Sequence, residues 1–184
     1  YSPNIHMMVK SIENEPPSFS DFVLNPGLYK NVRINSIGFI CDSSEGGYWS
    51  GKYIDGLLYQ MLYAVDWKDT DVLVIDMPPG CGEIHKKLFS HVRGKSLLIT
   101  TPQDVSHSDT IRGIEMLNRM HVDIIGLIEN MSHYACECGK EEKLFIGDTE
   151  ERVCKPYNIK MLISVPFIPR FGIASTKGIP LIMT

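Results

Sequence analysis

The sequence lacks a long hydrophobic run, an excess of positive charge and a large set of cysteines. Because a membrane-spanning helix needs about 20 consecutive apolar residues, we expect no transmembrane segment, and no signal peptide is visible. The formal net charge of −4 provides no basic surface for nucleic acid or for an anionic membrane. Five cysteines among 184 residues form no disulfide framework, and their odd number fits a reducing compartment. We therefore expect a protein of the cytoplasm, or of an organellar matrix, that binds neither nucleic acid nor membranes.

What is present is the composition of an ordinary globular protein, with 43% apolar and 22% charged residues. A chain of this length fits one domain with a substantial core. Its six histidines are scattered, and we expect them at the surface or in turns. The chain begins at Tyr1 rather than at a methionine, and its first residues resemble the interior of a loop. We therefore expect that sequence upstream of Tyr1 is missing.

Short apolar runs alternate with helical patterns beyond residue 35. The runs predict strands at 36–40, 72–75, 96–100, 122–128 and 161–165, and the periodic segments predict helices at 52–65, 83–92, 106–120 and 150–157. Ser106 and Asp109 have the spacing of a capping box, which predicts that the third of these helices starts there. Residues 1–35, interrupted by prolines, are predicted to be irregular. The alternation indicates an α/β fold, a doubly wound and mostly parallel sheet with helices on both faces.

The predicted strand at 72–75 consists of four apolar residues and ends at the carboxylate of Asp76. An all-apolar strand is typical of a parallel strand that is buried on both faces. Pro78, Pro79 and Gly80 follow and turn the chain. An acid at such a strand end is suited to a Mg²⁺ shell, and a glycine lets a backbone amide approach a phosphate. The alternative is a strand that ends in an Asp cap and a tight turn.

Polar residues follow several of the other predicted strands as well. Because ligands of open parallel sheets bind at the carboxyl ends of the strands, these residues are expected to lie around one edge. The set at the predicted strand ends comprises Asp76, Thr100, Thr101, Glu129, Asn130 and Pro166.

Cys136 and Cys138 form the second informative motif, two thiols one residue apart and followed by a glycine. A disulfide between them would be strained, so a metal or a dithiol fits better. Soft thiolates favour zinc or an iron–sulfur cluster, and both usually take four ligands. A symmetric dimer supplies four thiolates when two such loops meet on the two-fold axis. The alternative is a pair of surface cysteines without a metal.

Taken together, these motifs resemble the Mrp/ApbC family of P-loop ATPases, which carry or assemble iron–sulfur clusters. The run from Asp71 to Glu83, D-V-L-V-I-D-M-P-P-G-C-G-E, is similar to the family's D-Y-L-V-I-D-M-P-P-G-T-G-D. Further similar segments, in the family's order, are found at 1–5, 36–39, 49–51, 100–106, 109–115, 126–132 and 145–147.

The resemblance implies a P-loop NTPase fold of the dimeric, deviant Walker A type and Mg²⁺-dependent ATP hydrolysis. On this reading Asp76 holds Mg²⁺ through water and Gly80 senses the γ-phosphate, which makes both of them catalytic. Pro79 belongs to the same nucleotide-binding turn. Asn130 and the loop at Pro166 contact adenine.

The resemblance also implies that Cys136 and Cys138 hold a [4Fe–4S] cluster, or zinc instead, between the subunits of a homodimer. The cluster is then passed to apo iron–sulfur proteins. Two alternatives are a zinc-linked or metal-free dimeric scaffold, and a positioning ATPase of the MinD/ParA type. Residues 170–184 show neither the amphipathic helix nor the basic face that is usual in the latter.

Three features depart from the family pattern. The deviant Walker A loop, G-K-G-G-V-G-K-[ST], is absent and would precede Tyr1. Residues 1–184 are therefore expected to form a single P-loop ATPase domain without its N-terminal strand and Walker A loop, and hydrolysis by this stretch alone is not expected. The cysteine spacing is C-x-C instead of C-x-x-C, and Cys81 replaces the usual threonine.

Overall fold

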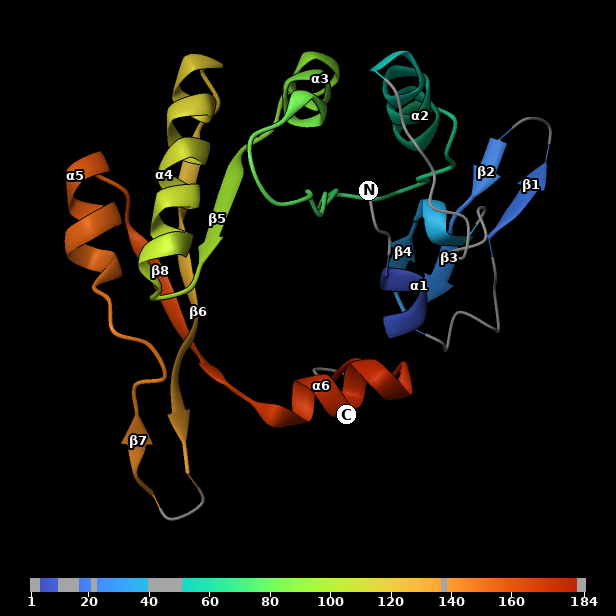
Figure 1. The fold of residues 1–184 in the computed structure, drawn as a ribbon. Coiled ribbons are helices and arrows are strands. Elements are labelled where there is room, and N and C mark those ends of the chain that lie inside the picture. Colours follow the sequence, from blue (N-terminus) through green and yellow to red (C-terminus); the bar gives the residue numbers. More distant parts are fainter. Residues whose placement is uncertain (1–3, 10–16, 21–22, 40–50, 137–138, 182–184) are drawn as a thin grey trace. The chain divides into compact units, whose positions relative to one another are not determined.

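The computed structural model describes residues 4–9, 17–20, 23–39, 51–136 and 139–181 (Figure 1). The chain divides into two compact units. One comprises residues 1–78 and 169–184, and the other comprises residues 79–168. Within the described residues no helix has the length and apolar character needed to cross a membrane.

The first unit contains short hairpins and helices (Figure 1). Two antiparallel pairs, β1 with β2 and β3 with β4, follow α1. Leu24 of β2 also bonds to the chain after α2, because its N–H donates to the Ala64 carbonyl at 2.8 Å and its carbonyl accepts from Asp66 N–H at 2.9 Å. The elements are α1 (Ile5–Met8), β1 (Ser18–Ser20), β2 (Val23–Asn25), β3 (Gly27–Tyr29), β4 (Val32–Ile34), η2 (Ile37–Phe39), α2 (Gly51–Tyr63) and α6 (Pro169–Lys177).

Three predictions for this unit are wrong. Within 1–35 the described residues form strands and a helical turn, since hairpins of three-residue strands leave too little periodicity to detect in the sequence. Ile37–Phe39 is a 3-10 helix instead of a strand. Residues 72–75 are not a strand, because no described strand pairs with them. Val72 and Val74 are 75% and 86% exposed, so this apolar run is not buried on either face.

The second unit is built on a sheet in which β6 is central (Figure 1). β5 and β8 pair parallel with β6 on its two edges, and β7 pairs antiparallel with its last two residues. The elements are α3 (Glu83–His91), β5 (Ser96–Thr100), α4 (Asp104–Arg119), β6 (Ile124–Ala135), β7 (Glu141–Glu142), η3 (Glu150–Cys154), α5 (Lys155–Tyr157) and β8 (Met161–Phe167). The α/β fold with a mostly parallel sheet is therefore confirmed.

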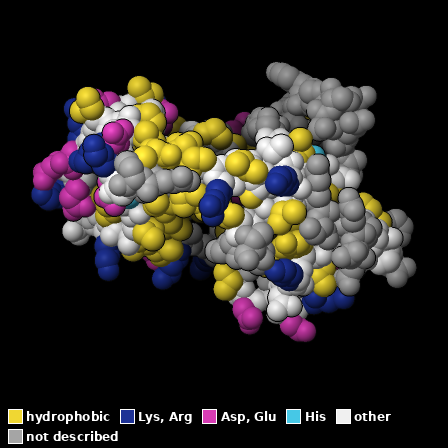
Figure 2. All heavy atoms as spheres, turned by 90° about the horizontal axis from the view of Figure 1, so that it is seen from below, with side chains coloured by type: hydrophobic (Ala, Val, Ile, Leu, Met, Phe, Trp, Pro, Cys, Tyr) yellow, Lys and Arg dark blue, Asp and Glu magenta, His cyan; other side chains and the backbone are white. Residues whose placement is uncertain are grey.

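One face of this sheet carries the core of the unit. Leu127 of β6 is completely buried and packs with Ile114 of α4 and with Val153 and Cys154 of η3. On the other face Leu97, Ile99 and Ile163 are 42%, 64% and 54% exposed, and Figure 2 shows wide areas of hydrophobic side chains at the surface. The helices of this unit thus cover only one face of the described sheet.

The predicted strands and helices of the second unit are confirmed, with shifted boundaries. β6 continues to Ala135, because its final residues pair with β7. The predicted capping box is wrong. α4 begins at Asp104, and its N-cap Gln103 makes no side-chain capping bond. The Ser106 hydroxyl lies 2.7 Å from the Thr101 hydroxyl instead, so a contact to the preceding strand end replaces the cap.

Candidate functional site

The carboxyl ends of three parallel strands form a row of polar residues. In the sheet register Thr100 of β5, Glu129 of β6 and Ser164 of β8 are neighbours. Asn130 pairs with Val165, which precedes Pro166. The structure therefore brings Thr100, Glu129, Asn130 and Pro166 to one edge of the sheet, as expected from their positions at strand ends.

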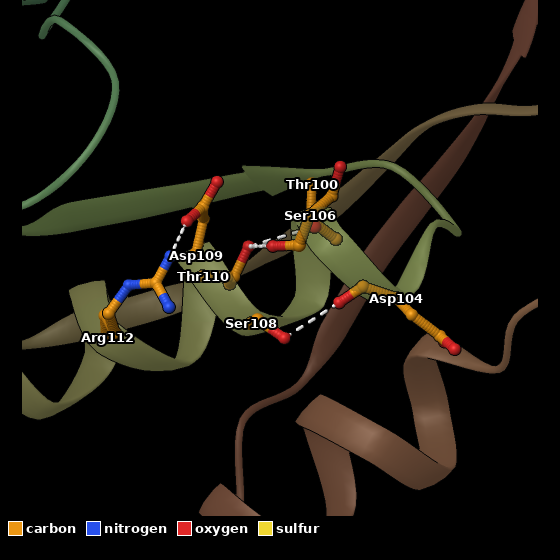
Figure 3. A network of polar contacts seen from close by, with 7 residues as sticks. All are labelled: Thr100, Asp104, Ser106, Ser108, Asp109, Thr110 and Arg112. Carbon is orange, nitrogen blue, oxygen red and sulfur yellow. Dashed lines mark hydrogen bonds and ion pairs between the residues drawn. The ribbon is translucent and has the colours of Figure 1, made fainter.

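Hydroxyl groups connect the end of β5 to the first turns of α4 (Figure 3). The Thr110 hydroxyl donates to the Ser106 carbonyl at 2.8 Å and lies 2.9 Å from the Thr100 hydroxyl. The Ser108 hydroxyl donates to the Asp104 carbonyl at 3.0 Å, and Arg112 pairs with Asp109 on the exposed side of the helix (Figure 3). The contact between Thr110 and Thr100 joins α4 to the end of β5 next to the row, whereas the other bonds lie within α4.

A buried side chain of α4 is linked to the row through hydrogen bonds. His107, which is 2% exposed, places Nε2 3.0 Å from the Thr149 hydroxyl. Thr149, which is 1% exposed, donates to the carboxylate of Glu129, and Ser164 donates to the other carboxylate oxygen at 3.4 Å. The Glu129 carboxylate is therefore held from two elements, the segment before η3 and the strand β8.

Asn130 has one half of its amide engaged and one half available. Its side-chain oxygen accepts from the Met131 N–H at 3.0 Å, and Met131 has a φ of 55°, in the left-handed region. No described residue accepts from the NH₂ group of Asn130. Asn130 therefore presents a donor, the chemistry that a ring nitrogen of a purine base accepts.

Gly80, in the turn after residue 75, has a backbone conformation that favours glycine. Gly80 has a φ of 92°, which L side chains rarely adopt. Asp76, Pro79 and Gly80 are all exposed. Asp76 falls in the first unit, whereas Pro79, Gly80, Asn130 and Pro166 fall in the second.

The cysteine motif lies in the hairpin that links β6 to β7. The Cys136 N–H donates to the Lys140 carbonyl at 2.9 Å, and the Gly139 N–H donates to the Cys136 carbonyl at 2.9 Å. Gly139 has a φ of 81°, a conformation that glycine adopts without the steric strain that a Cβ atom would cause. Cys136 is half-buried, and Cys138 lies outside the described residues. Two thiols that are one residue apart in the sequence suit two ligands of one metal centre.

The remaining described cysteines differ in environment. Cys81 is exposed, next to Gly80, and Cys154 is buried in the core of the second unit. Burial, followed by repulsion from the carboxylates of Glu150 and Glu129, raises the pKa of Cys154 from 9.0 to about 11. The Cys154 thiol therefore stays protonated and is a poor metal ligand.

This shift predicts an alkaline loss of stability. Because the folded-state pKa of Cys154 lies above the unfolded value, its contribution is complete below pH 9 and disappears as the pH rises towards 11. The expected loss of unfolding free energy across this window is roughly 3 kcal/mol. Urea unfolding at a series of pH values measures it. Cys154→Ala is the control, and an equally steep alkaline decline in that variant would show that another group is responsible.

The prediction that all histidines lie at the surface or in turns is wrong at two positions. Because of it, His107 is not among the candidate site residues predicted from the sequence. His85 and His107 are 6% and 2% exposed, and both lie on helices. His107 shares the buried stripe of α4 with Ile114 and Leu117, at spacings of seven and ten residues. This helical spacing is the feature of the sequence from which the burial of His107 could have been predicted. Thr149 gives no sequence signal, since its partners are 42 and 20 residues away.

Comparison with known proteins identifies the family of this chain. The family model described as "ParA: NUBPL iron-transfer P-loop NTPase" matches residues 1–184. An iron-sulfur cluster carrier protein of Haemophilus influenzae is 34% identical over 168 residues, which are 90% of this chain and 45% of the relative. An iron-sulfur protein required for NADH dehydrogenase, from Arabidopsis thaliana mitochondria, is 29% identical over all of this chain and 59% of the relative. The chain spans about half the length of the curated relatives it matches.

A solved structure shows the same fold. A nucleotide-binding protein of Archaeoglobus fulgidus, in complex with ADP, superposes with a TM-score of 0.73 over 94% of this chain and 68% of the other, at 24% identity. The family match covers the entire chain, and the fold agrees with it. This chain therefore belongs to the iron-transfer P-loop NTPases of the ParA family, the group that the Mrp/ApbC motifs indicated.

Proposed function

We propose that this chain is part of an iron–sulfur cluster carrier that binds and hydrolyses ATP with Mg²⁺. It holds a [4Fe–4S] cluster between the two subunits of a homodimer and passes the cluster to apoproteins. The observation that carries the proposal is the turn between β6 and β7, where backbone hydrogen bonds join Cys136 to Gly139 and Lys140. Cys138 belongs to the same motif in the sequence. The relatives named iron-sulfur cluster carrier protein support it.

The dimer follows from ligand number. One hairpin supplies two thiolates, and a cubane cluster is usually held by four. Two copies related by a two-fold axis present identical hairpins to each other and complete the set. The cluster is then bound at a subunit contact, where a small change in the contact exposes or covers it.

The nucleotide half of the proposal uses the edge of the sheet and the turn after residue 75. In this proposal Asp76 holds Mg²⁺ through water, and Gly80, after Pro79, brings its backbone N–H to the γ-phosphate. Asn130 donates its side-chain NH₂ to the adenine ring, and Pro166 packs beside the base. The exposure of Asp76 and Gly80 and the positive φ of Gly80 support these roles, as does the NH₂ group of Asn130, which has no acceptor among the described residues.

Anaerobic reconstitution tests this function. With ferrous iron, sulfide and a thiol reductant, the purified protein is expected to take up about two iron ions per chain, half of a shared [4Fe–4S] cluster. Mixing it with an apoenzyme that needs a [4Fe–4S] cluster is then expected to restore that enzyme's activity. Metal analysis gives the opposing outcome. Zinc at about one ion per two chains, with no uptake of iron and sulfide, indicates a zinc-linked scaffold.

A further inference from the structure

The buried polar chain from α4 to β6 has no role in the function proposed above. It consists of His107, Thr149 and Glu129, and its first two members are 2% and 1% exposed. Buried polar groups cost stability unless they are paired, so such a chain is expected to serve a purpose beyond packing.

In the hydrogen bonds that join His107, Thr149 and Glu129, the donor and the acceptor of each bond are determined. A carboxylate only accepts, so the single hydroxyl proton of Thr149 is given to Glu129. The Thr149 oxygen must then accept from Nε2–H of His107, 3.0 Å away. Among the described residues the Nδ1 atom of His107 is buried without a partner. The imidazole is thus oriented by one bond, and that bond points towards Glu129.

Glu129 is the last β6 residue paired with β5, opposite Thr100. Asn130 follows, and the pairing of β6 with β8 is irregular between Asn130 and Tyr134. Met131 then takes a left-handed conformation. Asn130 still pairs with Val165 of β8, but it has no partner in β5, so the sheet holds its backbone from one side only. The side chain of Glu129, held by Thr149 and Ser164, adds a constraint at the preceding residue.

The segment that carries Thr149 is itself fixed against α4. A Cβ atom on Gly147 would lie 1.8 Å from the Pro102 carbonyl oxygen and 3.3 Å from Cε1 of His107, so the two backbones are in direct contact. Arg152 of η3 pairs with Asp104 at the start of α4. Thr149 is therefore presented to Glu129 from a rigid support.

We propose that Thr149 and His107 are positioning residues for Asn130. Acting through Glu129, they hold the Asn130 amide where it donates to the base of a purine nucleoside triphosphate. This inference rests on the proposed nucleotide function. It assigns residues on the core side of the sheet to recognition of the base, while the phosphates are bound by other residues.

Thr149→Val tests the proposal, since it removes the hydroxyl and keeps the shape. Affinities for Mg²⁺–ATP and for Mg²⁺–tripolyphosphate, which has no base, are measured by calorimetry on the full chain. ATP binding is expected to weaken by roughly 3- to 10-fold, the effect of one hydrogen bond, with tripolyphosphate binding unchanged. Thr176→Val on α6, where the hydroxyl donates to the Gly172 carbonyl within its own helix, is expected to change neither affinity.

His107 provides an independent pair of variants. His107→Gln keeps an N–H donor near the position of Nε2 and is expected to retain the preference for ATP over tripolyphosphate. His107→Leu removes the donor and is expected to lose that preference to the same degree as Thr149→Val. This pair carries the comparison if Thr149→Val does not fold.

The outcomes separate the inference from the proposed function. A wild-type chain that binds ATP no more tightly than tripolyphosphate rejects the base contact itself. A wild-type preference that survives in Thr149→Val and in His107→Leu overturns the positioning role alone. An equal loss of both affinities in these variants also overturns it, because it shows a general structural role.

Discussion

The double substitution Cys136→Ser and Cys138→Ser is expected to reduce iron and sulfide uptake to the background level. Serine has nearly the size of cysteine but offers no soft thiolate, so the hairpin keeps its shape and loses its ligands. The turn itself depends on backbone bonds between Cys136, Gly139 and Lys140, which the substitution leaves in place. Iron and acid-labile sulfide per chain, together with the visible absorption of the cluster, provide the measurement.

The other cysteines provide matched controls for this experiment. Cys81→Ser removes an exposed thiol outside the hairpin. Cys154→Ala removes a buried thiol whose raised pKa keeps it protonated. Both variants are expected to bind iron and sulfide as the wild type does. If the hairpin variant also retains a full cluster, the ligands lie elsewhere and the proposed role of Cys136 and Cys138 is wrong.

Gly147→Ala is expected to cost more than about 2 kcal/mol of unfolding free energy. The added methyl group would lie 1.8 Å from the backbone carbonyl oxygen of Pro102. A backbone atom at the start of a helix cannot move aside as a flexible side chain can, so the segment at 147–149 must shift. That shift separates Thr149 from His107, so the preference for ATP over tripolyphosphate is expected to decrease as well. Urea unfolding measures the first effect.

Gly113→Ala is the matched control. Gly113 lies inside α4, and a Cβ there meets no atom within 4 Å. The substitution is expected to stabilise the protein by about 0.5–1 kcal/mol, the usual gain from replacing a helical glycine with alanine. If Gly147→Ala is as well tolerated as Gly113→Ala, the close packing of this segment on α4 has no energetic importance.

Local pattern was sufficient where an element has a long periodic segment or a paired apolar run. The helices α2, α3 and α4 and the strands β5, β6 and β8 follow the expected segments. For α4, β5, β6 and β8 the reason is visible, because their apolar residues pack on each other around Leu127 and Ile114. Pattern was insufficient for residues 72–75. Four apolar residues indicate a strand, but a strand exists only with a hydrogen-bonded neighbour, and none of the described strands pairs with them.

The site shows the same division. The sequence by itself determined the family, the cysteine pair and the residues at the strand ends, because short motifs and residue order carry these directly. Only the tertiary structure decided that the Glu129 carboxylate is bound by Thr149 and backed by His107. These contacts join residues that are 20 and 42 positions apart, and no local rule selects one buried hydroxyl or imidazole as the partner of another. Packing of η3 and α4 on the sheet brings them together.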